Sequence, residues 1–504
     1  MRPRVLIVAA LVLLPALAST APDRGPAEPA AADGTAGEWL ADLLVEATTA
    51  EGVLRHLAEF QRIADASDGT RAAGTPGHER SARYAGELLD AAGYDVDYQR
   101  LPFRYVETLT ERLTRLDAPA DDPEDPEDPE APEDPEDPED PGDIPVDAMT
   151  YTPNTPVGGL EAALAAVPDT GCAAADYASG DHAGRIALVA RGDCTFAEKQ
   201  ALAAEAGALA VLVHNNVPGP LAGTLSDPDN AVIPTGGITQ ADGEALAAEL
   251  AAGEEVTVRI ELEQLSEERT TVNVIAETPG GDPSRVVMAG AHLDSVIDGP
   301  GINDNASGAA GILNAALLFA ALAPADHPHT VRFALWSAEE FGLLGSEHYV
   351  ERLTPTERQD IALYLNFDMI GSPNPGFFVY DGEEEAEGGA ADQAAPPGSA
   401  AISRDLADFL RSRGVAPGTT EFNGRSDYAP FLDAGIPVGG TFSGAEDVKT
   451  ETEVGLWGGT ADAPYDECYH QSCDDLTNVG AAVLETHAQA IAHAVGAYAW
   501  HAPE

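Results

Sequence analysis

Five side chains of the types that bind metal ions follow strand-like segments in the second half of the chain. His292 directly follows an apolar run, and Asp304 comes shortly after it. Glu340 and Asp368 each follow a further strand-like run, and His470 lies between two cysteines in CYHQSCDD. Because ligands in open α/β sheets bind beyond the carboxyl ends of the strands, we expect these side chains to converge in one crevice.

Two imidazoles and three carboxylates are too many ligands for one tetrahedral zinc ion, but they suit two zinc ions if one carboxylate bridges them. Asp304 is the natural bridge, which leaves each zinc with one histidine and one terminal acid. Paired zinc ions polarise a carbonyl group and make water more acidic. Any one of these acids alone could be a solvated surface charge, but five donors at successive strand ends favour a metal site.

Hydrolysis also needs a general base, which takes a proton from water and returns it to the leaving group. Glu339 is next to Glu340 but need not bind metal, so we predict that Glu339 is the base. Asp294 lies two residues after His292 and could accept the second imidazole N–H, which would fix the tautomer of that ring.

The segments that must position these residues alternate between strands and helices. From residue 266 onwards, runs such as RVVMAGA and VRFALWS are interleaved with helical stretches such as 306–322. Helical spacing over 53–65 and 78–93, followed by the strand-like YDVDYQRLPF, places the start of the same layer in 38–110. We predict an α/β fold with a mixed, mainly parallel sheet that is covered by helices.

Two segments interrupt this pattern. Residues 111–144 contain Asp-Pro-Glu repeats, which we expect to form an extended linker because proline lacks a backbone donor and the acids repel one another. Residues 145–265 contain short β-rich runs such as GRIALVARG and GALAVLVHNN, joined by the helical pattern FAEKQALAAEAG. We expect an inserted β-rich domain here, between α/β segments 38–110 and 266–504.

The N-terminus has the features of a secretory signal peptide over residues 1–18, with basic residues, an apolar run and the small-x-small sequence Ala16-Leu17-Ala18. Pro15 interrupts the run before it reaches the roughly 20 residues that a membrane anchor needs. We expect a secreted chain with a disordered leader over 19–37 and no later membrane-spanning segment.

The four cysteines are best interpreted as two disulfides, because an oxidising compartment favours them. Cys468 and Cys473 are close enough to close a small loop, which leaves Cys172 to pair with Cys194. The alternative, a cysteine-rich zinc site, lacks CxxC spacing. The first pairing would fix the loop that carries His470.

The formal net charge of -60 excludes nucleic acid as a partner, because phosphate binding requires clustered lysine and arginine. The same charge repels anionic membranes. It also destabilises the compact state unless salt screens it, which suggests a halophilic protein. The alternative is that the acidic linker supplies the excess, but acids are dense in the predicted domains too.

The segments GAHLDS, GPGINDNASG, SAEEFGLLGS, NFDMIGSPNPG, GRSDYAPF and CYHQSCDD together resemble the secreted two-zinc aminopeptidases of the bacterial leucine aminopeptidase and aminopeptidase Y type. Residues 145–265 resemble a protease-associated domain. The resemblance implies a three-layer α/β/α zinc-exopeptidase fold and a metalloaminopeptidase with two Zn²⁺ per chain. It implies hydrolysis of an N-terminal, leucine-like apolar residue from peptides or proteins. Some relatives bind calcium, but we can match no calcium site here.

The resemblance also assigns roles to residues. It implies one zinc at His292 and Asp368 and the other at Glu340 and His470, with Asp304 as the bridge and Glu339 as the base. It further implies that Tyr469 hydrogen-bonds the oxyanion and that Arg425 positions the substrate near its free amino end. The family's usual histidine after GRSD is Tyr428 in this sequence.

Three rival functions remain to be weighed. A carboxypeptidase would need a cluster of arginines for the terminal carboxylate, and only Arg425 lies near a motif. A glutaminyl cyclase would not be expected to keep all five ligands. A binding protein that resembles the transferrin receptor ectodomain would need neither the ligands nor the base. We therefore expect an enzyme, and we expect it to be a monomer without a membrane anchor after signal cleavage.

Overall fold

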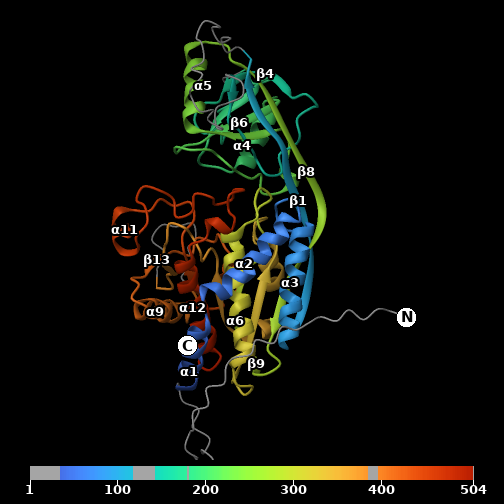
Figure 1. Cartoon of the computed structure of the whole chain (residues 1–504). Helices are drawn as coiled ribbons and strands as arrows, with labels where there is room; N and C mark the ends of the chain where they lie inside the picture. The colour runs from blue at the N-terminus through green and yellow to red at the C-terminus, as the bar shows by residue number, and fades with distance from the viewer. Residues whose placement is uncertain (1–34, 117–141, 179–180, 384–394, 503–504) are drawn as a thin grey trace, which may run out of the picture.

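The computed structural model describes residues 35–116, 142–178, 181–383 and 395–502. The predicted signal peptide, residues 19–34 of the predicted leader and the Asp-Pro-Glu repeats lie outside the described residues. The prediction that the disordered leader extends to residue 37 is wrong, because helix α1 already begins at Thr35. Figure 1 shows a large domain and a small domain, which are connected by the long strands β1 and β8.

The large domain is built on a mixed sheet with the strand order β13-β12-β14-β11-β9-β10-β8-β1. The four central strands, β14 to β10 in this order, are parallel to one another. At one edge β8 pairs antiparallel with β10, and β1 pairs antiparallel with β8. The strands are β1 (Asp95–Arg115), β8 (Thr257–Glu277), β9 (Asp282–His292), β10 (His329–Trp336), β11 (Ile361–Phe367), β12 (Phe378–Tyr380), β13 (Gly418–Thr420) and β14 (Val438–Phe442). The expected mixed, mainly parallel sheet is confirmed.

Helices cover both faces of this sheet, as the three-layer prediction required. Along β9, Val287 and Ala289 pack into the core under one helical layer, and Val286 and Met288 pack into the core on the opposite face. The first layer contains α1 (Thr35–Ala47), α2 (Ala50–Asp65), α3 (Pro76–Ala92), α6 (Gly308–Leu322), α9 (Ser399–Ser412) and α12 (Ala481–Tyr498). The second contains α7 (Leu344–Arg352) and α10 (Ala429–Asp433), and α8 (Pro355–Asp360) and α11 (Glu451–Trp457) are short peripheral helices.

The sequence explains where α3 begins and ends. The side chain of Thr75 accepts a hydrogen bond from the backbone N–H of His78, and Pro76 occupies the first helical position. Gly93 ends the helix with a φ of 99°, a left-handed conformation that favours glycine. The chain then enters β1, as the alternating sequence predicted.

The small domain contains a second, shorter set of strands in the order β4-β5-β6-β7-β3. Strands β4 to β7 are parallel and β3 is antiparallel at the edge. Its elements are β2 (Asp143–Ile144), β3 (Asp147–Ala148), β4 (Leu160–Ala166), β5 (Ile186–Ala190), α4 (Phe196–Glu205), β6 (Ala210–His214), η1 (Pro228–Asn230), β7 (Thr235–Ile238) and α5 (Gln240–Ala252). A disulfide between Cys172 and Cys194 cross-links this domain.

Strands β1 and β8 pair along almost their whole length and pass from one domain into the other (Figure 1). β1 continues to Arg115, beyond residue 110 where the linker was expected to begin, and β8 already begins at Thr257. Pairing satisfies the backbone donors and acceptors of both strands, so these charged segments are stable as a ribbon. A bulge between Thr108 and Thr110 leaves Leu109 without a partner opposite it.

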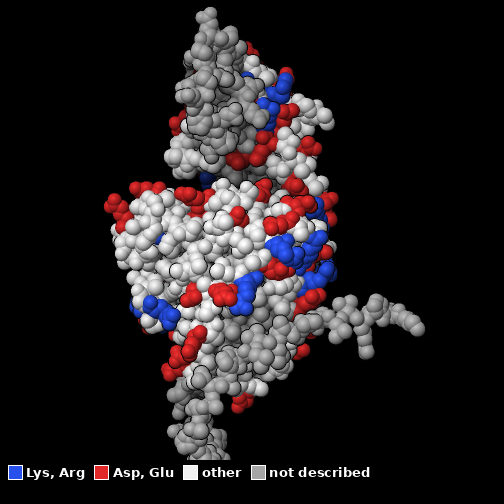
Figure 2. All heavy atoms as spheres, viewed as in Figure 1, with Lys and Arg blue, Asp and Glu red and all other residues white. Residues whose placement is uncertain are grey.

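Acidic side chains outnumber basic ones at the surface. On the face of the molecule drawn in Figure 2, acidic side chains lie on both domains and basic side chains lie in fewer places. The only two lysines, Lys199 and Lys449, are both fully buried. Lys199 donates from Nζ to the carbonyl of Gly192 at 2.7 Å, and Lys449 donates to the carbonyl of Pro375 at 2.6 Å. The described surface therefore presents guanidinium groups but no lysine ammonium.

One helical stretch, Ile302–Leu322, is long and apolar enough to cross a membrane by length and composition alone. The expectation that no later segment would qualify is therefore wrong on that criterion. The reason is packing, because 72% of its most apolar 18-residue window is buried inside the protein. Its apolar character on all sides is that of a central core helix.

Candidate metal centre

The five expected donors lie together at one edge of the large sheet. β11, β9 and β10 are neighbouring parallel strands, so their carboxyl ends meet at this edge. His292 is the last residue of β9, Asp368 directly follows β11, and Glu340 lies in the turn after β10. Asp304 lies in the kinked segment η2 (Ile302–Ser307), where its own backbone angles (φ -106°, ψ 96°) are not helical. His470 lies in the loop before η3 (Leu476–Asn478).

The loop that carries His470 is closed by a disulfide between Cys468 and Cys473, as predicted. Both cysteine pairs expected from the sequence are thus formed.

The donor atoms form two adjacent groups that share Asp304. In the first group, His292 Nε2 lies 3.1 Å from Asp304 Oδ1 and 3.2 Å from Asp368 Oδ1. In the second, His470 Nε2 lies 3.2 Å from Asp304 Oδ2 and 3.2 Å from Glu340 Oε2. One carboxylate oxygen of Asp304 therefore faces each histidine, as a bridging carboxylate would.

Asp304 is held by its backbone as well as by the fold around it. The carboxylate of Asp474 accepts hydrogen bonds from the backbone N–H of Asn303 at 2.8 Å and of Asp304 at 2.9 Å. The Asn478 amide donates to the same carboxylate at 3.1 Å. Sequence reasoning did not single out Asp474, although it is part of the CYHQSCDD segment. Its role depends on backbone donors far away in the chain, which no spacing pattern reveals.

Asp368 is supported by a chain of four hydrogen bonds that begins at Trp336. The Trp336 indole donates to the Tyr364 hydroxyl at 2.7 Å, and this hydroxyl donates to Asn366 Oδ1 at 2.9 Å. The Asn366 amide donates to Ser426 Oγ at 2.8 Å, and Ser426 donates to Asp368 Oδ2 at 2.5 Å. The oxygen of Asp368 that faces His292 remains available, because Ser426 binds the other one.

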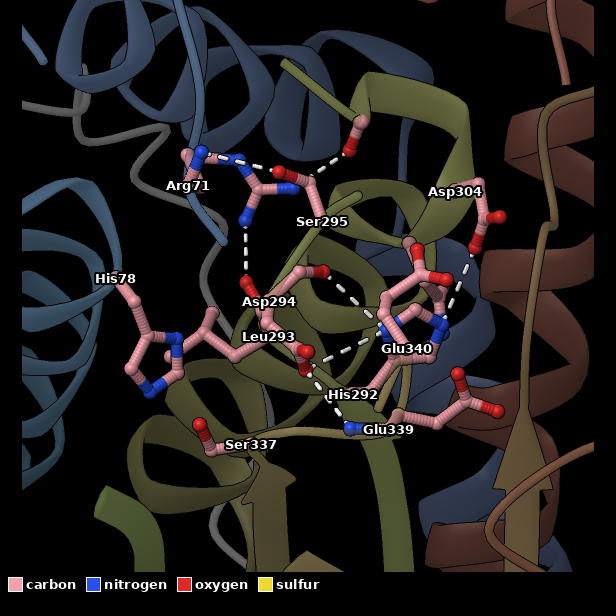
Figure 3. Close-up of polar contacts among 12 residues, drawn as sticks. Arg71, His78, His292, Leu293, Asp294, Ser295, Asp304, Ser337, Glu339 and Glu340 are labelled. Carbon is pink, nitrogen blue, oxygen red and sulfur yellow. Dashed lines mark hydrogen bonds and ion pairs between the residues drawn. The ribbon is translucent and has the colours of Figure 1, made fainter. Parts of the chain in front are cut away.

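A buried arginine ties together the loops that carry the donors (Figure 3). Arg71 is fully buried and donates to the carbonyl of Leu293, to that of Pro300 at 2.8 Å and to that of Gly301 at 2.6 Å. Its backbone N–H donates to Ser295 Oγ at 3.0 Å. Sequence reasoning missed Arg71 because its partners are backbone carbonyls, which leave no trace in residue types.

The second nitrogen of His292 faces Asp294, as Figure 3 shows. Nδ1 lies 3.2 Å from the backbone carbonyl oxygen of Asp294 and 3.7 Å from its carboxylate. The carboxylate instead accepts the backbone N–H of Glu339 at 3.3 Å. Asp294 thus contacts both the imidazole and the segment of the expected base, and the nearer acceptor for the ring is its backbone oxygen.

The electrostatics of the site favour bound cations. Burial raises the pKa of Glu340 to about 7 and that of Glu339 well above its usual value, and neighbouring carboxylates add to both shifts. Burial also raises the pKa of Asp427 to about 7, and neither of its carboxylate oxygens has a hydrogen-bond partner among the described residues. Glu340 Oε1 is likewise buried without a partner.

Burying several carboxylates together is costly unless positive charge compensates them. Histidine nitrogens and carboxylate oxygens are the donors that zinc takes in proteins. The residues present therefore fit a zinc site.

A pocket of about 370 Å³ opens onto these donors. Arg425 lies in the wall of this pocket. It donates hydrogen bonds to Glu446 Oε1 at 2.7 Å and to the Tyr469 hydroxyl at 3.3 Å. The ring of Tyr469 stacks on His470 with 3.9 Å between the ring centroids. Both residues that the resemblance placed near the substrate therefore lie at this pocket, with Tyr428 also in its wall.

Four residues near the donors have backbone in the left-handed region. Ala338 and Leu343 flank the glutamate pair with φ values of 57° and 61°, and Met369 follows Asp368 with a φ of 46°. His470 itself has a φ of 58°. Residues other than glycine adopt this conformation at a cost, and such residues cluster at functional sites.

Comparisons with known proteins identify relatives of both domains. The model of peptidase family M28 matches residues 273–495, and the model of the PA domain matches residues 160–246. A probable lipoprotein aminopeptidase, LpqL, of Mycobacterium tuberculosis is 38% identical over 93% of this chain and 88% of its own length. Leucine aminopeptidase 2 of Trichophyton rubrum is 46% identical over 71% of this chain and 70% of its own length.

Solved structures of aminopeptidases have a similar fold. An aminopeptidase from Aneurinibacillus sp. strain AM-1 superimposes with a TM-score of 0.69 and 27% identity, covering 92% of this chain and 96% of that one. BSAP, a zinc aminopeptidase from Bacillus subtilis, superimposes with a TM-score of 0.63 and 26% identity, covering 89% of this chain and 95% of that one.

Proposed function

Since this chain belongs to peptidase family M28, carries an inserted PA domain and is a metalloaminopeptidase, we propose that it uses two zinc ions to remove single apolar residues from the N-termini of peptides. The observation that carries the two-zinc proposal is the arrangement around Asp304, whose two carboxylate oxygens face two different histidines. One zinc would be held by His292, Asp368 and Asp304, and the other by His470, Glu340 and Asp304.

Bound zinc would supply Lewis-acid polarisation of the peptide carbonyl and would make water more acidic. The protein's own residues orient the substrate and move the proton. Glu339 lines the pocket beside the donors, and its backbone is fixed by Asp294. As the attacking water forms its bond to the carbonyl carbon, Glu339 takes the proton, and it returns this proton to the amine nitrogen when the C–N bond breaks.

The oxyanion that develops during this attack needs a hydrogen-bond donor. Tyr469 fits that role, because its ring lies against His470 and its hydroxyl points to the pocket residue Arg425. Glu339 and Asp368 offer carboxylates for the free α-amine, and Arg425 with its partner Glu446 lies nearby in the same wall.

The preference for an apolar residue rests on the composition of the pocket. Six large apolar or aromatic side chains contribute to its wall, namely Leu343, Met369, Tyr380, Tyr428, Phe442 and Tyr469. Burying a leucine side chain of the substrate against this wall stabilises the complex by about 2 kcal/mol. Tyr428, which replaces the usual family histidine, lies against Tyr380 with 4.9 Å between ring centroids and so adds to the apolar wall.

We also propose that the protein works outside the cell and in salt. Two disulfides are stable in an oxidising compartment. A net charge of -60 with no lysine on the described surface suits a salt-screened environment. Measuring the unfolding temperature between 0.1 and 3 M salt tests the second point, and a temperature that does not rise with salt would refute it.

The activity is tested with leucine p-nitroanilide and its N-acetyl derivative, before and after chelation. Cleavage of the free-amine substrate alone, lost on chelation and restored by zinc, is the expected result. Two zinc ions per chain by elemental analysis would support the assignment of the donors. Cleavage of the acetylated substrate would contradict the proposal. Full restoration of activity by a single equivalent of zinc would also contradict it.

A further inference from the structure

A second and larger cleft adjoins the candidate active-site pocket. Its volume is about 870 Å³, and it shares Glu340 and Gly342 with the pocket that contains the zinc donors. One wall comes from the large domain, including Ile297 and Phe341, and the other includes Tyr151 of the small domain. The cleft therefore borders the pocket at Glu340 and lies between the two domains.

The charged side chains that line this cleft are all acidic. Besides Glu340, they are Glu107 and Glu111 of β1 and Asp298 of the loop after β9. Across the part of the chain that the structure describes, none of the arginine ion pairs includes Glu107, Glu111 or Asp298. The nearest basic side chains pair with other acids: Arg269 stacks on Tyr105 and pairs with Glu267, and Arg104 pairs with Glu268.

The fold holds two of these carboxylates in place. Glu107 accepts a hydrogen bond from the Tyr105 hydroxyl at 2.9 Å, and Glu111 accepts one from the backbone N–H of Ala148 at 2.8 Å. Partial burial raises the pKa of Glu111, and the nearby charge of Asp298 adds to this shift. Negative charge from β1 and from the loop after β9 thus acts at the same place.

An apolar strip lies beside the acids. Leu109, at the β1 bulge, is 52% exposed and lines the cleft together with Ile297 and Phe341. Long basic side chains suit such a surface, because their methylene groups pack on apolar residues while the charged end reaches a carboxylate.

We propose that this cleft binds the part of the peptide that follows the cleaved bond and that it favours lysine or arginine there. The inference rests on the proposed function, since the N-terminal residue must occupy the 370 Å³ pocket beside the donors. The rest of the peptide then has to leave this pocket, and the acidic cleft adjoins the pocket at Glu340 and Gly342. Unpaired carboxylates there attract a cationic residue and repel an anionic one.

The test compares three peptides that share the cleaved bond: Leu-Ala-Ala-Ala-Ala, Leu-Ala-Lys-Lys-Ala and Leu-Ala-Glu-Glu-Ala. In 0.1 M salt, the wild-type kcat/KM should be about tenfold higher for the lysine peptide than for the glutamate peptide. Each pair of charges contributes little in a water-like medium, but a few pairs together give a difference of this size. The ratio should shrink in 1 M salt because salt screens the interaction. Equal values for the two peptides would overturn the inference.

The combined variant Glu107→Gln, Glu111→Gln and Asp298→Asn keeps the shapes and the acceptor oxygens but removes three charges. Its lysine-to-glutamate ratio should fall to about one, with an unfolding transition that shows it is folded. Glu205→Gln is the control, because Glu205 is an exposed acid of α4 that does not line the cleft. A ratio that survives in the combined variant, or that falls equally in Glu205→Gln, would overturn the inference.

Leucine p-nitroanilide separates this inference from the proposed function. Cleavage of that substrate without discrimination between the charged peptides would refute the cleft assignment and leave the aminopeptidase proposal intact. No cleavage of it by the zinc-loaded wild-type protein would overturn the proposed function and this inference with it.

Discussion

Ser426 donates a 2.5 Å hydrogen bond to Asp368 through the carboxylate oxygen that faces away from His292. The serine therefore sets the orientation of the carboxylate without competing for the oxygen that we assign to zinc. Replacing partners of this kind usually weakens metal binding by about 10- to 100-fold. Ser426→Ala should show this loss in a zinc titration against a competing chelator.

The control for that variant is Ser412→Ala, which removes a hydroxyl bonded to the carbonyl of Phe409 near the end of α9. It should bind zinc like the wild type. Equal affinities for the two variants would mean that Ser426 does not position Asp368.

Glu339 should be needed for turnover and not for metal binding. Glu339→Gln removes the proton acceptor but keeps the size of the side chain, so we expect kcat to fall by about 10²- to 10⁴-fold. Zinc content, measured by elemental analysis, should stay at the wild-type value. Glu340→Gln is the matched comparison and should lose zinc as well as activity. Near-normal turnover by Glu339→Gln would assign the base to another residue.

Arg71 should matter for stability, because three backbone carbonyls depend on it. Arg71→Met leaves these acceptors buried without donors and removes a cation from among carboxylates, which should lower the free energy of unfolding by about 3 to 5 kcal/mol. Denaturant unfolding in the presence of a chelator measures this without a contribution from zinc. Arg55→Met, at an exposed position of α2, should change little. An unchanged denaturation midpoint for Arg71→Met would show that these loops do not depend on Arg71 for their stability.

His487 should make the fold sensitive to acid. Burial lowers its pKa to about 4, and its ring nitrogens contact Thr441 Oγ1 at 2.8 Å and the carbonyl of Gly376 at 3.0 Å. In the unfolded chain the pKa is about 6.5, so between pH 6.5 and 4 the unfolded state binds a proton that the folded state does not. Stability from this residue is complete above pH 6.5 and falls by about 3 kcal/mol as the pH drops to 4.

The check is the free energy of unfolding at pH 7.5 and pH 4.5 for the wild type and for His487→Gln. The variant should start from a lower stability but lose less on acidification. A pH dependence identical to that of the wild type would assign the acid sensitivity to other groups, such as His56, whose pKa is also lowered to about 4 by burial.

Much of the site could be anticipated because it depends on a rule of sheet geometry. His292, Asp368 and Glu340 follow three neighbouring parallel strands, so a strand-by-strand interpretation already brings them to one edge. Asp304 and His470 lie in loops, and only their residue types and the family resemblance pointed to them. In the structure, His470 Nε2 lies 3.2 Å from Asp304 Oδ2.

The supporting residues could not be found in the same way. Arg71 and Asp474 act on backbone groups more than 150 residues away, as the separations of 229 and 171 residues in two of their hydrogen bonds show. Backbone donors and acceptors are the same for nearly every residue type, so sequence patterns carry no record of such contacts. The extent of the β1–β8 ribbon was also missed, because its charged residues gain stability from pairing with a distant strand.

The burial of Lys199 and Lys449 has a practical consequence for anyone handling the protein. Amine-reactive dyes and cross-linkers will find no lysine target on the described surface of the native enzyme. Each lysine becomes accessible only when its own domain opens, since Lys199 lies in α4 and Lys449 lies just before α11. Labelling at the two positions, followed by mass spectrometry, therefore reports separately on the opening of the small and the large domain.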